Sequence, residues 1–185
     1  MLEEEDKNGN QKGFSDIKEF TSAVKSPKAI MMLVPAGKIV DSVIEELLPL
    51  LDKGDILIDG GNSHFTDTDR RVAYLESKGF HFFGMGISGG EEGASFGPSM
   101  MPGGGREAYN VMKPILESIA AKVDGEPCVT YIGPGASGHF VKMVHNGIEY
   151  GLMQLIAETY EVLKKGLQLD NEAIGKIFGQ WNAGR

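Results

Sequence analysis

The chain has 185 residues, of which 41% are hydrophobic, and it carries a formal net charge of -8 at pH 7. That length and apolar content suit a domain of ordinary size, and an acidic chain without a block of Lys or Arg argues against nucleic-acid binding. The single cysteine, Cys128, excludes an internal disulfide, and the longest apolar run, around Ala29 to Val34, is far shorter than the roughly 20 residues of a membrane-spanning helix. We therefore expect a cytoplasmic protein whose partner is a small molecule.

After a polar stretch from Met1 to Gly13, which we expect to form a frayed end or a loop, apolar runs and helical patterns alternate along the chain. The predicted strands are Ala29–Val34, Ile56–Ile58, His81–Phe83, Ser99–Met101 and Val129–Ile132. The predicted helices are Ser15–Val24, Ile39–Leu51, Thr66–Ser77 and Glu107–Ala121, the last broken or bent near Pro114. Strands that alternate with helices indicate an α/β fold with a Rossmann-like, mostly parallel sheet and flanking helices.

From about Ser137 the strand pattern stops and the sequence becomes helical. One long segment runs to about Lys165, and a shorter one runs from Asp170 to Gly179. The α/β part is therefore followed by a long helix that begins an all-α region.

Ligands of open α/β sheets bind beyond the carboxyl ends of the strands, so the loops after the predicted strands are candidate sites. The first loop is Val34-Pro35-Ala36-Gly37, the second is Asp59-Gly60-Gly61-Asn62-Ser63, and the third runs from Gly84 to Gly90. Asn62 at a strand end can bond a sugar hydroxyl or a cofactor amide, or it can be a simple turn residue. The Ser88-Gly89-Gly90-Glu91-Glu92-Gly93 segment fits a carboxylate or phosphate seat, and equally a glycine turn before a helix with an acidic first turn.

The segment from Gly138 to Gln154 carries two stripes at helical spacing. The polar stripe holds Lys142, His145, Asn146 and Glu149, and the apolar stripe, expected to face a core, holds Val141, Val144, Ile148, Leu152 and Leu155. Burial can lower the pKa of a lysine enough for it to act as a base, and a glutamate two turns away can deliver a proton to the other end of a small substrate. The alternative is a solvated surface pair, since Lys and Glu on one helix commonly face water.

Two further features are not predicted to take part in catalysis or ligand binding. His64 and His81 lack partners at ligand spacing, so we predict no metal site. The Asp69-Arg70-Arg71 run is predicted to be helix surface.

Four motifs together make the chain resemble the decarboxylating 6-phosphogluconate dehydrogenases over about Phe14 to Arg185. They are Ile58-Asp59-Gly60-Gly61-Asn62, the segment Ser88-Gly89-Gly90-Glu91-Glu92-Gly93-Ala94, the segment Gly97-Pro98-Ser99-Met100-Met101-Pro102-Gly103-Gly104, and the helix segment Lys142-Met143-Val144-His145-Asn146-Gly147-Ile148-Glu149-Tyr150. Related β-hydroxyacid dehydrogenases share the Ser-Gly-Gly loop and the lysine, but the Glu-Glu-Gly continuation and His-Asn-Gly-Ile-Glu-Tyr favour the phosphogluconate branch.

This resemblance implies oxidation of 6-phosphogluconate by NADP and its decarboxylation to ribulose 5-phosphate in the pentose phosphate pathway, by a homodimer and without a metal. It implies that Lys142 is the general base and Glu149 the acid that protonates the enediol. The implied substrate contacts are Asn62, Ser88, Gly89, Gly90, His145, Asn146 and Tyr150, and the implied cofactor contacts are Val34, Pro35, Ala36 and Asn62. Residues 1–136 would then form a partial dinucleotide-binding domain, and residues 137–185 a connecting helix and the start of the helical C-terminal domain.

The sequence departs from the family pattern in two respects. Family members often carry a lysine at the position of Pro35, and no Gly-x-Gly-x-x-Gly turn precedes Phe14 in this sequence. The residues that read the 2'-phosphate belong to that same region, so NAD stays open beside NADP. The alternative hypothesis is a folded fragment that binds a sugar phosphate or associates with other subunits without turnover of its own.

Overall fold

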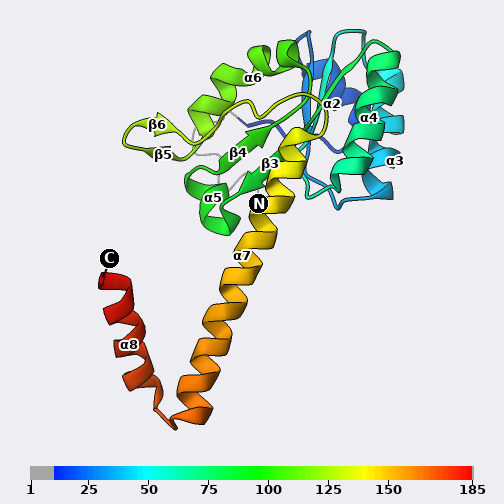
Figure 1. Cartoon of the computed structure of the whole chain (residues 1–185). Coiled ribbons are helices and arrows are strands. Elements are labelled where there is room, and N and C mark those ends of the chain that lie inside the picture. The colour runs from blue at the N-terminus through cyan, green and yellow to red at the C-terminus, as the bar shows by residue number, and fades with distance from the viewer. Residues whose placement is uncertain (1–10, 185) are drawn as a thin grey trace. The chain divides into compact units, whose positions relative to one another are not determined.

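The computed structural model describes residues 11–184, so residues 1–10 of the predicted N-terminal loop lie outside the described part. Within that part, four strands form one sheet in the order β1-β2-β3-β4 (Figure 1). The strands are β1 (Ala29–Met32), β2 (Ile56–Asp59), β3 (His81–Ser88) and β4 (Ser99–Pro102). The first three are parallel and β4 is antiparallel to β3, so the predicted mostly parallel α/β sheet is confirmed.

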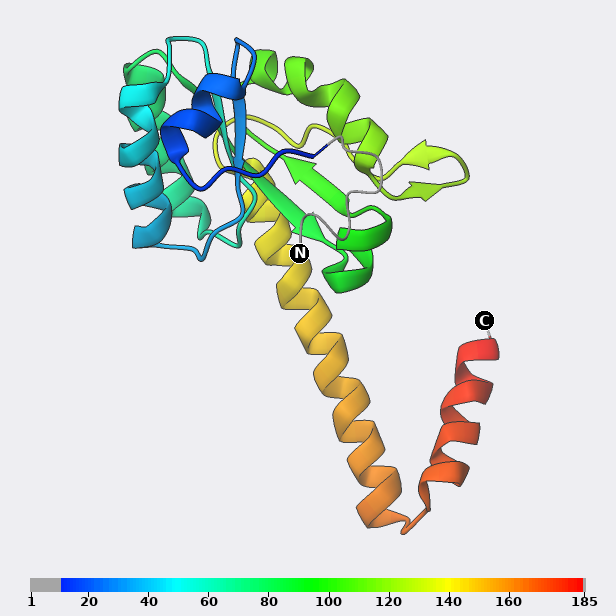
Figure 2. The same ribbon diagram turned by 180° about the vertical axis from the view of Figure 1, so that it is seen from behind.

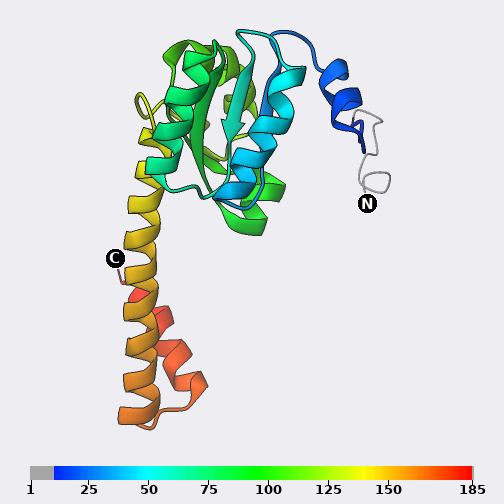
Figure 3. The same ribbon diagram turned by 90° about the vertical axis from the view of Figure 1, so that its right-hand side faces the viewer.

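Helices cover both faces of this sheet. On one face α3 (Lys38–Leu47) and α4 (Phe65–Ser77) pack on strand residues such as Ile30, Leu57 and Phe82 (Figure 3). The short helix α2 (Ile17–Ala23) joins the same cluster through Ile17 and Phe20 (Figure 2). On the other face α6 (Arg106–Ile119) packs on strand residues such as Ile58, Met85 and Met100. Alternating strand residues thus build two separate apolar layers.

Several element boundaries differ from the sequence prediction. Helix α2 starts later than the predicted helix Ser15–Val24, because Asp16 is its N-cap and the Asp16 carboxylate accepts hydrogen bonds from the amides of Lys18 and Glu19. Helix α3 gives way to a short 3-10 turn, η1 (Leu48–Leu50), and α6 runs unbroken past Pro114. Helix α5 (Gly90–Phe96) follows β3, in agreement with the second interpretation of the Ser88 to Gly93 segment, a glycine turn before an acidic helix.

The largest difference concerns β3, which continues five residues beyond the predicted end at Phe83. Its glycine-rich half is extended because Met85 to Ser88 pair with β4, from Pro102 back to Ser99. Conversely, the predicted strand Val129–Ile132 is not formed, and within this range only Val129 makes an isolated bridge, with Met100. Pro102 has no N–H to donate, so β4 cannot support a continuous ladder on that side. The described residues instead form a small hairpin of β5 (Lys122–Val123) and β6 (Glu126–Pro127).

The chain divides into two compact units, residues 1–143 and residues 144–185. The division falls within the long helix α7 (Ser137–Glu161), which ends in a π-helical turn, η2 (Val162–Gly166), before α8 (Asn171–Ala183). These helices confirm the predicted change from strands to helices. No helix among the described residues is both long and apolar enough to cross a membrane.

Candidate active site

The loops that follow β1 and β2 meet at the carboxyl edge of the sheet. The amide of Gly60 donates to the Met32 carbonyl at 3.0 Å, which joins the two loops. A Cβ on Gly61 would lie only 2.9 Å from the Val34 carbonyl oxygen, so this close approach requires glycine. Pro35, Ala36 and Asn62, three of the predicted cofactor contacts, are exposed beside this junction. The structure therefore brings the predicted cofactor segments together on one rim.

A buried network beneath this rim holds the loop that carries Asn62. Asp59 is fully buried and accepts hydrogen bonds from the Gly61 amide at 3.0 Å and the Ser63 hydroxyl at 2.6 Å. The guanidinium of Arg71, which is 1% exposed, lies 3.6 Å from the Asp59 carboxylate. A buried carboxylate needs such partners, since burying an unpaired charge is costly. The loop conformation is thus set by its own carboxylate.

Arg71 also reaches the start of α3. It donates to the Gly37 carbonyl at 2.9 Å and to the Asp41 carboxylate at 2.8 Å. The hydrogen bond from Arg71 holds the pKa of Asp41 below its ordinary value. The prediction that the run from Asp69 to Arg71 is helix surface is therefore wrong for Arg71. Its position between Thr68 and Val72 on the buried face of α4 was the available signal.

Glycines let the first turns of α7 approach the sheet. A Cβ on Gly86 of β3 would overlap the Cβ of Lys142, and a Cβ on Gly138 would lie 2.5 Å from the Gly84 carbonyl oxygen. Only a bare backbone permits this approach. Lys142 is 7% exposed as a result, so it is not the surface residue of the alternative interpretation. The burial that the general-base hypothesis requires is present.

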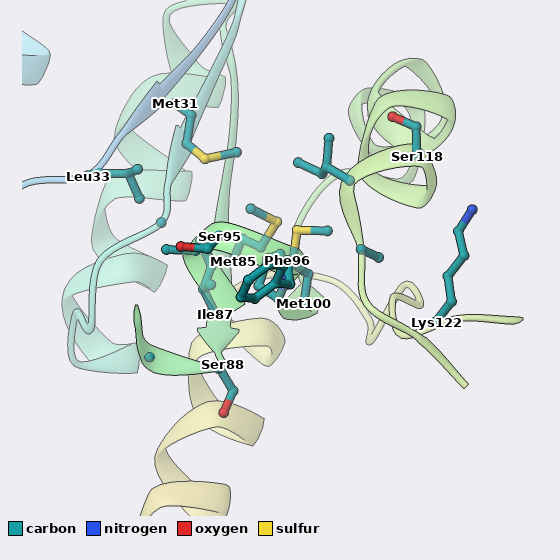
Figure 4. Close-up of a pocket in the computed structure, with 18 residues that line it drawn as sticks. Met31, Leu33, Met85, Ile87, Ser88, Ser95, Phe96, Met100, Ser118 and Lys122 are labelled. Carbon is teal, nitrogen blue, oxygen red and sulfur yellow. The ribbon is translucent and has the colours of Figure 1, made fainter. Parts of the chain in front are cut away.

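Ser88 shares the sheet face of Lys142. Side chains alternate along a strand, so Ser88 points to the same side as Gly86, against which Lys142 packs. Figure 4 shows the Ser88 hydroxyl directed away from Met85 and Ile87. Gly89, which follows, has a φ of +142° and caps α5, whose first turn carries Glu91 and Glu92. The glycine turn before an acidic helix is therefore present, and the anion seat at Ser88 to Gly90 stays a prediction.

His139, a residue that the sequence analysis did not single out, is buried three residues before Lys142. It is 2% exposed, and its Nδ1 lies 2.7 Å from the hydroxyl oxygen of Thr68 in α4. Burial lowers the pKa of His139, and the nearby charge of Asp59 opposes that shift. Its place one helical turn before Lys142 was the sequence signal that could have found it.

The remaining predicted polar residues lie on the part of α7 that belongs to the second unit. There the Nδ1 of His145 lies 3.6 Å from the Glu149 carboxylate and 3.1 Å from the Asn146 side-chain oxygen. Glu149 and Tyr150 are exposed. Val141 of the predicted apolar stripe is half-buried, but the other four residues are exposed, with Ile148 and Leu155 each at 62%. The expectation that this stripe faces a core is therefore not met beyond Val141 among the described residues.

An apolar pocket of about 1000 Å³ lies on the sheet face opposite Lys142 (Figure 4). The strand residues Met31, Met85 and Met100 line it, together with Phe96. Ser88 to Gly90 form its border. The β3 strand end thus separates this pocket from the side on which Lys142 lies.

A mostly parallel sheet with helices on both faces and small-residue loops at its carboxyl edge defines a Rossmann-like α/β domain of the nucleotide-binding class. Among the described residues, no group of three His, Cys, Asp or Glu side chains is placed to hold a metal ion.

Comparison with known protein families identifies one family within this class. Residues 3–133 match the NAD binding domain of 6-phosphogluconate dehydrogenase, and residues 138–185 match the 6-phosphogluconate dehydrogenase C-terminal domain. The chain therefore belongs to the 6-phosphogluconate dehydrogenase family.

Individual relatives agree with this assignment. The chain is 57% identical over 182 residues to the decarboxylating 6-phosphogluconate dehydrogenase of Chlamydia muridarum, covering 98% of this chain and 38% of the relative. It is 55% identical over 181 residues to the NADP(+)-dependent decarboxylating 6-phosphogluconate dehydrogenase of Bacillus subtilis. This match covers 98% of this chain and 39% of the relative. The 6-phosphogluconate dehydrogenase of Plasmodium falciparum, solved as apo form and with NADP+ or 6-phosphogluconate, superposes with a TM-score of 0.88 at 47% identity over 92% of this chain and 37% of that one. The chain thus spans less than two fifths of the length of these relatives.

Proposed function

We propose that this chain carries the catalytic lysine and part of the cofactor site for the oxidative decarboxylation of 6-phosphogluconate to ribulose 5-phosphate and CO2 with NADP. The observation that carries the proposal is Lys142, buried against Gly86 on the side of β3 to which Ser88 points. The Plasmodium relative has been solved in complex with NADP+ and in complex with 6-phosphogluconate, which supports the choice of cofactor and substrate.

In this proposal Lys142 accepts the proton of the substrate's C3 hydroxyl as that carbon is oxidised. Its buried position excludes bulk water from the amine, and general-base catalysis needs such a positioned group. The ketone formed at C3 takes up the electron pair when the C1–C2 bond breaks and CO2 leaves. Lys142, now protonated, stabilises the oxyanion that develops on C3.

Glu149 then donates a proton to the carbon that was C2 of the substrate, which becomes C1 of ribulose 5-phosphate. Its carboxylate lies 3.6 Å from Nδ1 of His145, within ion-pair distance on their part of α7. The pairing of Glu149 with Lys142 is supported by their spacing in the sequence and by the family resemblance. His145, Asn146 and Tyr150 are proposed to contact the substrate from the same helix.

The loops at the carboxyl edge are proposed to bind both ligands. Asn62, Ser88, Gly89 and Gly90 would offer hydrogen bonds to the substrate, and the Val34-Pro35-Ala36 turn beside Asn62, in which Pro35 and Ala36 are exposed, would border the cofactor. The close junction of Gly61 with the Val34 carbonyl fits a cofactor laid along both loops. NADP, when bound, supplies the hydride acceptor. NAD is the alternative cofactor, because the matched domain is described only as NAD binding.

The experiment is NADPH formation by the purified chain with 6-phosphogluconate and NADP, with Lys142→Ala beside it. Lys113→Ala is the matched control, because Lys113 lies on α6 with its side chain 51% exposed. Turnover that disappears with Lys142→Ala and persists with Lys113→Ala would support the proposal. Equal rates in all three proteins would remove Lys142 from the base role.

A second candidate is a folded fragment that binds a sugar phosphate or other subunits and does not turn over alone. It is favoured by the large apolar side chains exposed on α7 and α8, such as Ile148, Leu155 and Trp181. Calorimetric binding of 6-phosphogluconate to a folded chain that forms no NADPH would support this candidate. We also propose a cytoplasmic location and a homodimer for the complete protein, the latter testable by light scattering.

A further inference from the structure

His139 and Thr68 form a buried polar pair that has no role in the proposed reaction. Thr68 is fully buried and His139 is 2% exposed, although neither belongs to the proposed ligand contacts. Their hydrogen bond, at 2.7 Å, joins residues 71 apart in the sequence. Burying an imidazole and a hydroxyl is unfavourable unless each finds a partner, so this bond fixes the two helices relative to each other at that point.

The His139 ring contacts three other elements besides its own helix. It rests on β3, where a Cβ on Gly84 would lie 2.5 Å from its Nδ1. It bonds α4 through Thr68. Its environment also includes the Asp59 carboxylate and the backbone of Asp59 and Gly61, at the end of β2. One side chain thus connects the turn of α7 that carries Lys142 with the loop that carries Asn62.

The hydrogen bonding around Thr68 permits two tautomers of the neutral ring. The Thr68 hydroxyl can donate to Nδ1 of His139, or it can accept from Nδ1–H and donate to the His64 carbonyl, which is 3.4 Å away. Nε2 is buried and makes no hydrogen bond of good geometry among the described residues, although the backbone of Asp59 and Gly61 lies near the ring. In both arrangements the ring is held at its Nδ1 edge, by Thr68.

We propose that His139, locked by Thr68, is a positioning residue that sets the direction of Lys142 and holds the first turn of α7 against the Asp59–Asn62 loop. The proposal rests on the proposed function in taking Lys142 as the base. Lys142 follows His139 by one helical turn, so a rotation of that turn moves both side chains together. Positional errors of about 1 Å are enough to lower a rate strongly, which gives this contact a catalytic consequence.

The test measures the chemical accessibility of Lys142 directly. The folded chain is acetylated with trace acetic anhydride, and the labelling of Lys142 is read by peptide mass spectrometry relative to exposed Lys113. Thr68→Val keeps the shape and removes the hydroxyl, so we expect a severalfold rise in relative labelling of Lys142. Thr68→Ser restores the hydroxyl and should return labelling to the level of the unaltered chain.

A second pair of variants guards against misfolding of the first. His139→Asn keeps a hydrogen-bonding group near Nδ1, whereas His139→Leu keeps apolar volume alone. Labelling near the unaltered level with Asn, and a severalfold rise with Leu, would support positioning by the hydrogen bond. Unchanged labelling in folded Thr68→Val or folded His139→Leu would overturn the proposal, because packing alone would then hold the turn.

Labelling requires neither substrate nor turnover, so it separates this proposal from the proposed function. If the unaltered chain forms no NADPH, this result counts against catalysis by the chain alone. The labelling of Lys142 still decides whether His139 is a positioning residue. In an active protein, Thr68→Val should lower kcat with little change in KM for 6-phosphogluconate. A change in KM alone would contradict positioning of the base.

Discussion

The two ends of α7 differ in what surrounds them, although one continuous helix contains both. In residues 137–143, Gly138, His139 and Lys142 are buried against the sheet. In residues 144–161, glycines such as Gly147 and Gly151 have open space where a Cβ would stand, and large apolar side chains such as Ile148 are exposed. The same helical pattern therefore serves a tightly fitted segment and an uncovered one. Periodicity marks which residues share a face, but only a packing partner decides whether that face is buried.

The largest difference between the two ends of α7 should appear when the proposed base and the proposed acid are each replaced. Lys142→Met and Glu149→Gln should each lower turnover of an active form by about 10²- to 10⁴-fold, the usual contribution of a positioned acid or base. Because Lys142 is buried and Glu149 is exposed, only the Lys142 variant should also change the free energy of unfolding. Steady-state NADPH formation and urea unfolding of both variants check this. Equal stability effects would erase the difference between the two ends of α7.

The next largest effect should come from the buried ion pair beneath the Asn62 loop. Arg71→Met leaves the buried carboxylate of Asp59 without its cationic partner, which should lower the free energy of unfolding by about 3–5 kcal/mol. Lys176→Met on α8 is the control, since its partner Glu172 and Lys176 itself are 80% and 70% exposed, and exposed pairs contribute about 0–1 kcal/mol. Chemical denaturation followed by circular dichroism measures both. A loss of less than 1 kcal/mol for Arg71→Met would show that the loop does not depend on this pair.

Two glycines of α7 should respond to alanine with opposite signs. Gly138→Ala places a methyl 2.5 Å from the Gly84 carbonyl oxygen, and overpacking of this kind typically costs about 1–3 kcal/mol. Gly151→Ala meets nothing within 4 Å and should stabilise the helix by up to about 1 kcal/mol through its higher helix propensity. Urea midpoints of the two variants decide the matter. Stabilisation by Gly138→Ala would contradict the close packing of α7 on β3.

The smallest effect should be a pH dependence from His139. Burial lowers its pKa below the ordinary value of 6.5, so between the two values the unfolded chain binds more protons than the folded one. The free energy of unfolding should therefore be fully retained above about pH 6.5 and decrease as the pH falls toward the lowered pKa. His139→Asn should flatten this slope. An unchanged slope in that variant would assign the effect to other groups.

The sequence by itself determined the broad plan of the chain. Short apolar runs bounded by Pro and Gly were sufficient to predict β1, β2 and the parallel arrangement, because buried parallel strands need continuous apolar residues. The spacing of Lys142, His145, Asn146 and Glu149 was sufficient to predict a polar stripe, because helical geometry depends on local periodicity. The four motifs were sufficient to predict the family that the comparisons then showed.

Tertiary structure alone decided the features that depend on residues distant in the chain. β3 extends to Ser88 because β4 pairs with it, which local propensity in a glycine-rich segment does not predict. Arg71 is buried because Asp59 lies beneath the rim, although its charge predicts exposure. His139 gains its place through Thr68, 71 residues earlier in the sequence. Contacts between separate elements are set by how the chain packs as a whole, and a pattern read along the sequence carries only the local part of that information.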